Sequence, residues 1–237
     1  MTLLMNRFAA WMAEHDADSP ATPAATVLAL RDTDRGPEIL MVQRNAKGTF
    51  ASNWVFPGGK VDPEDYRGDD NLIDASRRAA SREALEEADL VVDESTLVPF
   101  SHWMPPTVVS RRFATWFFAT EAPAGVDGDV TIDGGEIVDH LWVTPAVALE
   151  RQARGEVILV PPTWITLHHL AGFDSVADAL AFVTDREPPF YLTRMLEGEP
   201  QTVAWHGDAG YPIGRADVDG PRHRLVMDPA GWIFDEP

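Results

Sequence analysis

The chain has 237 residues, a formal net charge of −19 and no cysteine. The lack of cysteine excludes disulfides, zinc–thiolate sites and thiol nucleophiles. The negative charge argues against a nucleic-acid partner, because phosphate backbones require clustered Lys and Arg. No apolar run approaches the roughly 20 residues that cross a bilayer, and Leu3–Met12 lacks a basic leader and a cleavage site. We therefore expect a cytoplasmic protein with neither a membrane nor a nucleic-acid partner.

In chain order, the first predicted element is a short amphipathic helix over Leu3–Glu14. Two apolar runs, Ala24–Leu30 and Glu38–Gln43, are predicted to be strands because a charged turn with Gly and Pro separates them. Trp54–Gly59 is expected to form a short strand that ends in a Gly-Gly turn. Ala75–Ala88 lacks Pro and Gly and is rich in Ala, Arg and Glu, which predicts a long helix.

The rest of the chain is predicted to contain strands, then helices, then a hairpin. The strands are expected over Leu97–Met104, Arg112–Thr120 and Ile137–Val143, and the helices over Pro145–Arg154, Thr163–Gly172 and Ser175–Thr184. Arg224–Met227 and Trp232–Phe234 are expected to pair around an Asp-Pro-Ala-Gly loop. Because strands precede and follow one long helix, the fold class is α+β. The expected domains are an N-terminal helix and linker (1–22), a core (23–155) and a C-terminal helical and β extension packed on the core (156–237).

Three carboxylates share one face of the predicted long helix. With about 100° per residue, Glu83, Glu86 and Glu87 fall within an arc of roughly 100°. The opposite side carries residues that can pack: Ala84, Leu85 and Ala88. Hard divalent cations such as Mg²⁺ and Mn²⁺ relieve the repulsion among such carboxylates and bridge them to phosphates. A solvated acidic face is the alternative that the helix alone leaves open.

The segment before this helix adds to the metal hypothesis. Pro57-Gly58-Gly59 can bring backbone N–H groups close to an anion. Asp62, Glu64 and Asp65 follow the glycines and can supply a further carboxylate from a loop. A double glycine and an acidic helix in this order predict a divalent-metal site that faces a phosphate.

These residues resemble the Nudix box, which is usually written G-x5-E-x7-R-E-U-x-E-E-x-G-U. Gly59, Asp65 and Arg82–Leu90 carry the resemblance, and the flanking strands extend it over most of Ala24–Val143. The chain departs from the pattern in three ways. Asp65 stands where the family has Glu, and an Asp follows Ala88 where the family has the helix-ending Gly. Sixteen residues instead of seven separate Asp65 from Arg82, an insertion of nine that we place within Tyr66–Asp74.

The resemblance implies a Nudix α/β/α sandwich with a mixed sheet, to which this chain adds C-terminal helices and a hairpin. It also implies a Mg²⁺ or Mn²⁺ cofactor and hydrolysis of a diphosphate. The implied metal ligands are four carboxylates: Glu83, Glu86, Glu87 and Asp65. Arg82 would orient the carboxylates, and Glu86 or Glu136 would be the general base. Gly58 and Gly59 would shape the approach of the phosphate.

The insertion resembles the organellar acyl-coenzyme A diphosphatase-like branch of the family. Other segments similar to that branch are His102–Pro106, Arg111–Phe113, Thr115–Phe118 and Pro161–Thr163. Arg111 and Arg112 can meet a phosphate and Trp103 can stack on an adenine, and Arg44 is also assigned to the substrate. The alternatives are a place in the core for Trp103 and ion pairs with acidic residues for the two arginines. The upstream motif of another coenzyme A-hydrolysing branch is not visible in Val42–Phe56.

Coenzyme A or an acyl-CoA is therefore the favoured substrate and the only expected partner, with a homodimer left open. Two alternatives also stay open. One is a hydrolase of ADP-ribose, a dinucleoside polyphosphate or a nucleotide sugar. The other is a catalytically silent Nudix domain that binds a nucleotide, although all three helix glutamates are present.

Overall fold

The computed structural model describes residues 21–47, 51–68, 71–109, 111–125, 130–132 and 134–236. The helix predicted over Leu3–Glu14 lies outside them. The chain forms two compact units. The core unit contains Thr22–His102 and Thr115–Pro189, and the C-terminal unit contains Trp103–Ala114 and Phe190–Pro237. The predicted domain boundaries at residues 22 and 155 stay predictions. In the described part of the chain, no helix has the length and apolar content that crossing a bilayer requires.

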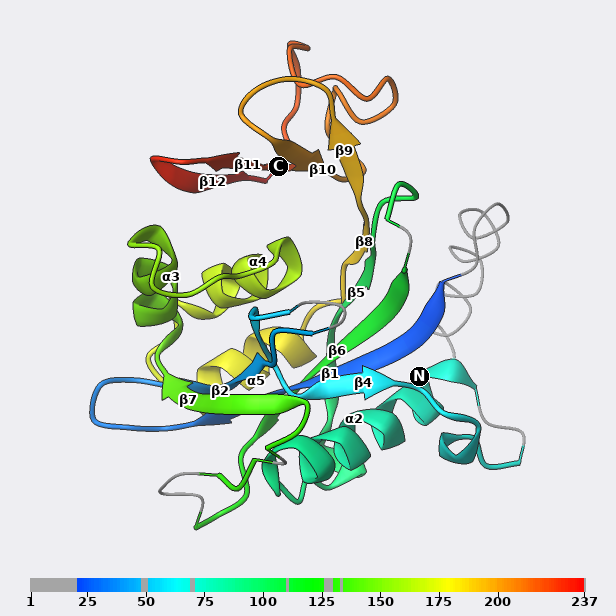
Figure 1. Ribbon diagram of the computed structural model, residues 1–237, viewed down its shortest axis with the longest axis vertical. Coiled ribbons are helices and arrows are strands. Elements are labelled where there is room, and N and C mark those ends of the chain that lie inside the picture. Colours follow the sequence, from blue (N-terminus) through cyan, green and yellow to red (C-terminus); the bar gives the residue numbers. More distant parts are fainter. Residues whose placement is uncertain are drawn as a thin grey trace. The chain divides into compact units, whose positions relative to one another are not determined.

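A mixed sheet with helices forms the core unit, as the α+β prediction requires (Figure 1). Its strand order is β3-β2-β1-β6-β5, with β4 paired to β1 and β7 paired to β2. The strands are β1 (Thr22–Arg31), β2 (Glu38–Arg44), β3 (Trp54–Val55), β4 (Gly58–Lys60), β5 (Val98–Met104), β6 (Phe113–Glu121) and β7 (Ile137–Val143). The strand predictions are thus confirmed at nearly the expected bounds. All residues of Ala24–Leu30 are buried, because both faces of β1 are covered.

Helix α2 (Leu72–Ala88) lies along one side of the sheet, and α3 (Pro145–Ala153) and α4 (Pro161–Leu170) lie on the other (Figure 1). α2 begins at Leu72 and not at the predicted Ala75, because the Asn71 side chain accepts hydrogen bonds from the N–H groups of Ile73 and Asp74. The helix ends at Ala88, and the next residue, Asp89, caps it with a φ of 50°, the left-handed conformation that Gly usually adopts there.

Small residues allow α2 to approach β1 and β4 closely. Its buried alanines are Ala75, Ala79, Ala80, Ala84 and Ala88. Leu85 was predicted to pack with them and does not, since it is 47% exposed. It lies beside the buried alanines on the exposed side of the helix.

All three later helices differ slightly from their predicted bounds. α4 begins at Pro161, two residues before the predicted start, because prolines fit the first turn of a helix. α3 ends at Ala153, one residue before the predicted end. α5 (Val176–Thr184) begins one residue later than predicted, after Ser175, whose hydroxyl caps the helix by accepting a hydrogen bond from the Asp178 N–H. Two 3₁₀ turns, η1 (Pro63–Asp65) and η2 (Glu94–Thr96), flank α2.

The predicted Gly-Gly turn is wrong. Gly58 and Gly59 lie in β4 and pair with Thr26 and Ala25 of β1. Glycine is required here for close approach and not for a turn, because a Cβ at Gly58 would meet the Thr26 Cα and Cβ at 2.7 Å.

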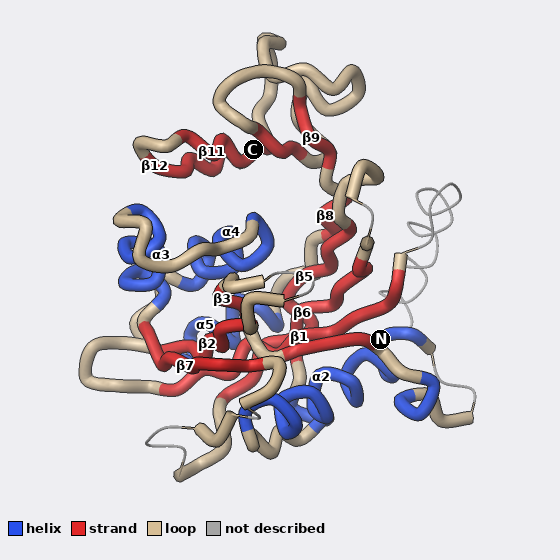
Figure 2. Tube along the Cα trace, in the orientation of Figure 1, coloured by secondary structure: helices blue, strands red, loops and turns tan. Residues whose placement is uncertain are grey.

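The C-terminal unit contains a four-stranded sheet of order β12-β11-β10-β9 (Figure 2). The strands are β9 (Arg194–Leu196), β10 (Thr202–Ala204), β11 (Arg224–Asp228) and β12 (Gly231–Asp235), and β8 (Phe190–Leu192) precedes them. The pairing of Met227 with Trp232 confirms the predicted hairpin. A buried Asp208–Arg224 ion pair joins the 205–223 loop region to β11.

Candidate functional site

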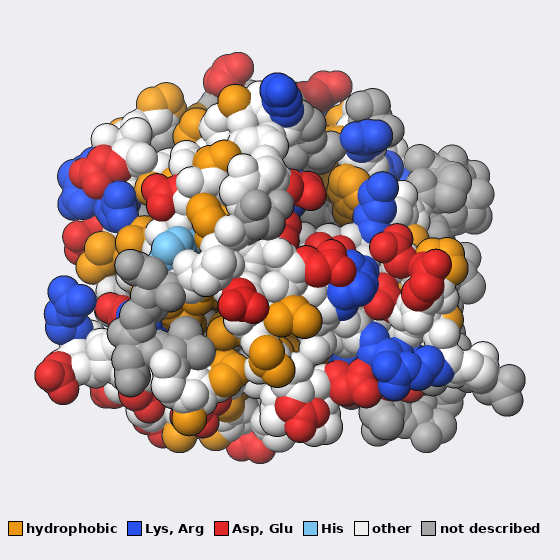
Figure 3. Space-filling model, turned by 60° about the horizontal axis from the view of Figure 1, so that its bottom comes forward, with side chains coloured by type: hydrophobic (Ala, Val, Ile, Leu, Met, Phe, Trp, Pro, Cys, Tyr) orange, Lys and Arg blue, Asp and Glu red, His pale blue; other side chains and the backbone are white. Residues whose placement is uncertain are grey.

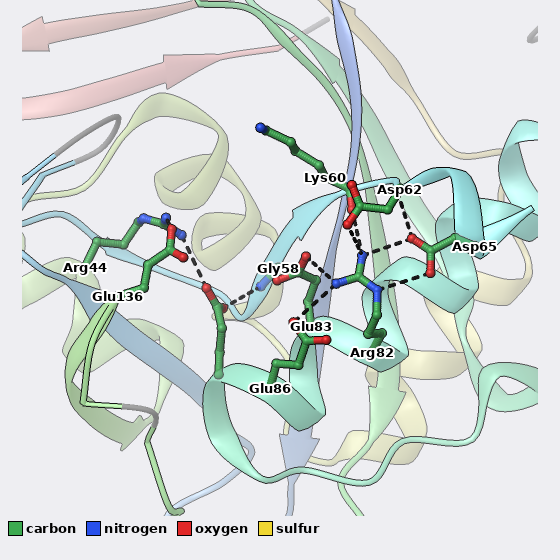
Figure 4. A network of polar contacts seen from close by, with 10 residues as sticks. Arg44, Gly58, Lys60, Asp62, Asp65, Arg82, Glu83, Glu86 and Glu136 are labelled. Atoms are coloured by element: carbon green, nitrogen blue, oxygen red, sulfur yellow. Dashed lines mark hydrogen bonds and ion pairs between the residues drawn. The ribbon is translucent and has the colours of Figure 1, made fainter.

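The candidate site lies where the C-terminal half of α2 meets β4, η1 and the neighbouring ends of β2 and β7 (Figure 4). Of the predicted residues, the structure brings together Arg44, Gly58, Gly59, Asp65, Arg82 and Glu136 with the three helix glutamates. Every one of them belongs to the core unit.

Glu87 is the most buried of the three helix glutamates, at 5% exposure. Its Oε2 accepts a hydrogen bond of 2.9 Å from the N–H of Gly58. Its Oε1 lies 3.3 Å from the Arg44 guanidinium. The carboxylate therefore has a fixed orientation, held by the backbone of β4 on one side and by a cation from β2 on the other.

Glu83 lies against Gly59. A Cβ at Gly59 would meet the Glu83 carboxylate at less than 3.0 Å, so only glycine leaves this carboxylate in place. Burial raises the pKa of Glu83, and the nearby Glu86 and Asp62 add to the rise, while Arg82 opposes it. Negative charge is thus held here against a desolvation cost, which a divalent cation would offset.

Arg82 organises the carboxylates around it. Its guanidinium donates to both oxygens of Asp65, at 3.2 and 2.9 Å, and to Glu83 at 2.8 Å. It also contacts Glu86 at 3.4 Å and the carbonyl oxygen of Lys60 at 2.9 Å. These contacts, led by the hydrogen bonds to Asp65, raise the pKa of Arg82 further above its usual value.

Asp65 holds Arg82 in this position. It is 5% exposed and accepts a 2.9 Å hydrogen bond from the Asp62 N–H, which closes η1. Since both oxygens of Asp65 accept hydrogen bonds from Arg82 or Asp62, the structure shows it as a partner of Arg82. The metal-ligand role expected for Asp65 stays a prediction.

Arg44 and Glu136 meet because β2 and β7 are paired. Arg44, the last residue of β2, is opposite Ile137 at the start of β7. The Arg44 guanidinium forms an ion pair with Glu136, whose side chain is 58% exposed. The pairing thereby brings a residue 92 positions further along the chain to the C-terminal end of α2.

Carboxylates outnumber cations in this cluster. The carboxylates that pair within it belong to Asp62, Asp65, Glu83, Glu86, Glu87 and Glu136, and their cationic partners are Arg44 and Arg82. Within the described residues, no three Asp, Glu or His side chains are already grouped closely enough to hold a metal ion. The helix glutamates face arginines instead.

Three predicted substrate residues belong to the C-terminal unit. Trp103 is 3% exposed, and its ring stacks on Tyr191 at a centroid distance of 3.9 Å. Arg112 is 7% exposed and donates to the Pro105 carbonyl oxygen at 3.2 and 3.3 Å. Arg111 is exposed. Trp103 is thus a core residue, as the alternative prediction had it. The Arg111 side chain, in contrast, is accessible to an anion.

Lys60 was missed by the sequence reasoning. It follows the double glycine, its carbonyl oxygen accepts a hydrogen bond from Arg82, and its side chain is exposed. A cation directly after the two glycines was the signal in the sequence.

Comparison with known proteins places the site in a family. Residues 20–161 match the model of the NUDIX domain. A NUDIX hydrolase from Alicyclobacillus acidocaldarius matches with a TM-score of 0.62 and 22% identity, over 70% of this chain and 97% of that one.

Two further structures match with lower TM-scores. The NUDIX domain of Shewanella oneidensis NrtR in complex with ADP ribose matches with a TM-score of 0.49 and 15% identity, over 73% of this chain and 97% of that one. An Ap4A hydrolase from C. elegans matches with a TM-score of 0.42 and 19% identity, over 68% of this chain and 98% of that one. Comparison with curated proteins gives no significant match.

Proposed function

The chain belongs to the NUDIX family of pyrophosphohydrolases, and we propose that it hydrolyses the diphosphate of a nucleoside-diphosphate derivative with Mg²⁺ or Mn²⁺ held by α2. The observation that carries this proposal is the excess of carboxylates around Glu83, Glu86 and Glu87. An anionic substrate approaches such a cluster only if further cations neutralise it.

The residues present fit a hard divalent cation. All three helix side chains supply carboxylate oxygens, which Mg²⁺ and Mn²⁺ prefer. Burial raises the pKa of Glu83 although Arg82 contacts it, and a bound cation would favour its charged form. When bound, the cation supplies positive charge to the diphosphate oxygens. Glu83, Glu86 and Glu87 would hold it.

Groups of the protein itself orient the carboxylates and act as the general base. The Gly58 N–H and Arg82 keep the carboxylates oriented. We assign the general base to Glu86, whose side chain is 57% exposed and has a single 3.4 Å contact with Arg82. Glu136 is the alternative base, and it is already paired with Arg44. Comparing the pH dependence of kcat in Glu86→Gln and Glu136→Gln distinguishes the two assignments.

Coenzyme A or an acyl-CoA is the substrate that we propose. The nine-residue insertion and the segments similar to the acyl-coenzyme A diphosphatase-like branch support it. Because Trp103 is buried, its ring is not accessible for an adenine to stack on. A panel of coenzyme A, ADP-ribose, diadenosine polyphosphates and nucleotide sugars with Mg²⁺ or Mn²⁺ tests the proposal. Rapid cleavage of ADP-ribose with no turnover of coenzyme A would contradict it.

Glu87→Gln tests the metal role of α2. The amide keeps an oxygen for the Gly58 N–H but loses the charge, so we expect kcat to fall more than about 100-fold. The free energy of unfolding should change by only about 1 kcal/mol, because Arg44 keeps its ion pair with Glu136. Glu121→Gln, at the exposed end of β6, is the matched control. Wild-type turnover by Glu87→Gln would refute the role of Glu87, and no turnover of any diphosphate by the wild-type protein would favour the silent domain.

A further inference from the structure

Arg44 pairs with two carboxylates of the candidate site. Its guanidinium lies 3.3 Å from Glu87 and also forms an ion pair with Glu136, which is labelled beside it in Figure 4. The side chain is only 18% exposed, so this contact is partly shielded from water. The positive charge that neutralises the Glu87 carboxylate is therefore the Arg44 guanidinium of the chain itself.

Hydrogen bonds hold the backbone around this contact in place. The Arg44 N–H donates to the Asn53 carbonyl oxygen at 3.1 Å, and the pairing with β7 holds the residue from the other side. The Glu87 carboxylate is held in turn by the Gly58 N–H at its other oxygen. A divalent cation that binds Glu87 Oε1 would therefore compete with the Arg44 guanidinium for that oxygen.

We propose that Arg44 is an exchangeable counterion: it neutralises Glu87 and Glu136 in the metal-free protein and transfers to a substrate phosphate when a divalent cation takes Glu87. This inference rests on the proposed function. It accounts for the lack of a preformed group of three free carboxylates in the described chain. It also gives the released guanidinium a partner, since its planar donors fit phosphate oxygens in pairs.

The experiment measures Mn²⁺ binding to the full-length chain without substrate, by electron paramagnetic resonance of the free ion. Arg44→Gln removes the competing cation, so Mn²⁺ should bind about tenfold more tightly than to wild type, while the KM for the diphosphate substrate rises. Arg44→Lys keeps the charge and should leave the Mn²⁺ affinity near that of wild type. Arg31→Gln is the matched control, because Arg31 pairs with Glu38 on another part of the sheet, at 2.8 Å, and its loss changes the net charge equally.

Each result decides the matter. Mn²⁺ affinity of Arg44→Gln no greater than that of Arg31→Gln overturns the exchange and leaves the proposed function intact if the wild type still binds Mn²⁺ and cleaves diphosphates. A wild-type protein that does neither overturns both.

A second measurement does not depend on the Arg44→Gln variant. The Arg44 side-chain N–H resonances of the wild-type protein, assigned by their absence in Arg44→Lys, should shift when Mg²⁺ is added. Resonances that stay unchanged at saturating Mg²⁺ would overturn the exchange even if Arg44→Gln did not fold.

Discussion

Gly59 shows how a single residue sets the geometry of the site. It lies in an ordinary extended strand, so its backbone accepts any residue. The constraint comes from α2, because the Glu83 carboxylate lies where a Cβ of residue 59 would be. At the residue scale the site is thus defined by close approach, and the same is true of Gly58 against Thr26.

Gly59→Ala should displace the Glu83 carboxylate without unfolding the chain. We expect kcat to fall about 100-fold, because a shift of about 1 Å in a catalytic constellation has that effect, and Tm to change by only about 2 °C. Steady-state kinetics and thermal unfolding measure the two effects. Gly172→Ala, where a Cβ meets nothing within 4 Å, is the control and should match wild type. Full activity of Gly59→Ala would show that the position of Glu83 is unimportant.

At the element scale, α2 connects the cap at Asn71 to the carboxylates at its other end. The Asn71 side chain accepts from two of the first N–H groups of the helix, at 3.0 and 3.1 Å. This cap adds three residues to the helix that composition alone predicted. The glutamates lie three turns further on, where the buried alanines hold the helix against the sheet.

Asn71→Ala should lower the free energy of unfolding by about 1 kcal/mol, because the two N–H groups lose their acceptor. Urea denaturation measures the change. Asn71→Asp keeps an acceptor and places a negative charge at the helix N-terminus, so it should be at least as stable as wild type. Equal loss in both variants would mean that the cap contributes nothing and that tertiary packing alone fixes the start of α2.

At the scale of the whole molecule, charge and buried titratable groups determine how stability responds to the solvent. Acidic and basic side chains are interspersed over the face drawn in Figure 3, yet the chain as a whole carries −19. Self-repulsion of that charge opposes the compact state, and salt screens it. A metal bound at α2 should add to stability beyond this general screening.

MgCl₂ should therefore raise Tm more than NaCl at equal ionic strength. Binding to the folded state alone stabilises by about 2.7 kcal/mol when the ligand reaches 100 times its Kd. Differential scanning calorimetry of wild type and Glu87→Gln tests this, since the variant should respond equally to both salts. A Mg²⁺ response unchanged in Glu87→Gln would place the bound ion elsewhere.

His102 makes stability depend on pH. Complete burial beside Trp116 lowers the pKa of His102 to about 3, from about 6.5 in the unfolded chain. The unfolded state therefore binds the proton more readily, and the contribution of neutral His102 is complete above pH 6.5 and is lost as the pH falls towards 3. We expect the free energy of unfolding to fall by about 1.4 kcal/mol per pH unit across this window. His102→Gln should flatten the slope, and an unchanged slope would assign it to other groups.

Local spacing determined much of this protein before any folding was considered. Positions three and four apart on a helix share a face whatever the tertiary structure, so the sequence alone brought Glu83, Glu86 and Glu87 together. Apolar runs bounded by Gly and Pro likewise predicted the strands of the core unit and the C-terminal hairpin. The Nudix box and the α+β fold followed from those patterns.

Tertiary structure alone decided how the carboxylates are neutralised and which of them are buried. Glu136 reaches Arg44 only through the pairing of β7 with β2, and Asp65 holds Arg82 only because η1 folds against α2. The double glycine became part of a strand, and Trp103 became a core residue, because each contacts a segment distant in sequence. Spacing fixes a side chain relative to its own helix or strand, whereas its partner and its exposure depend on contacts between segments that no local pattern encodes.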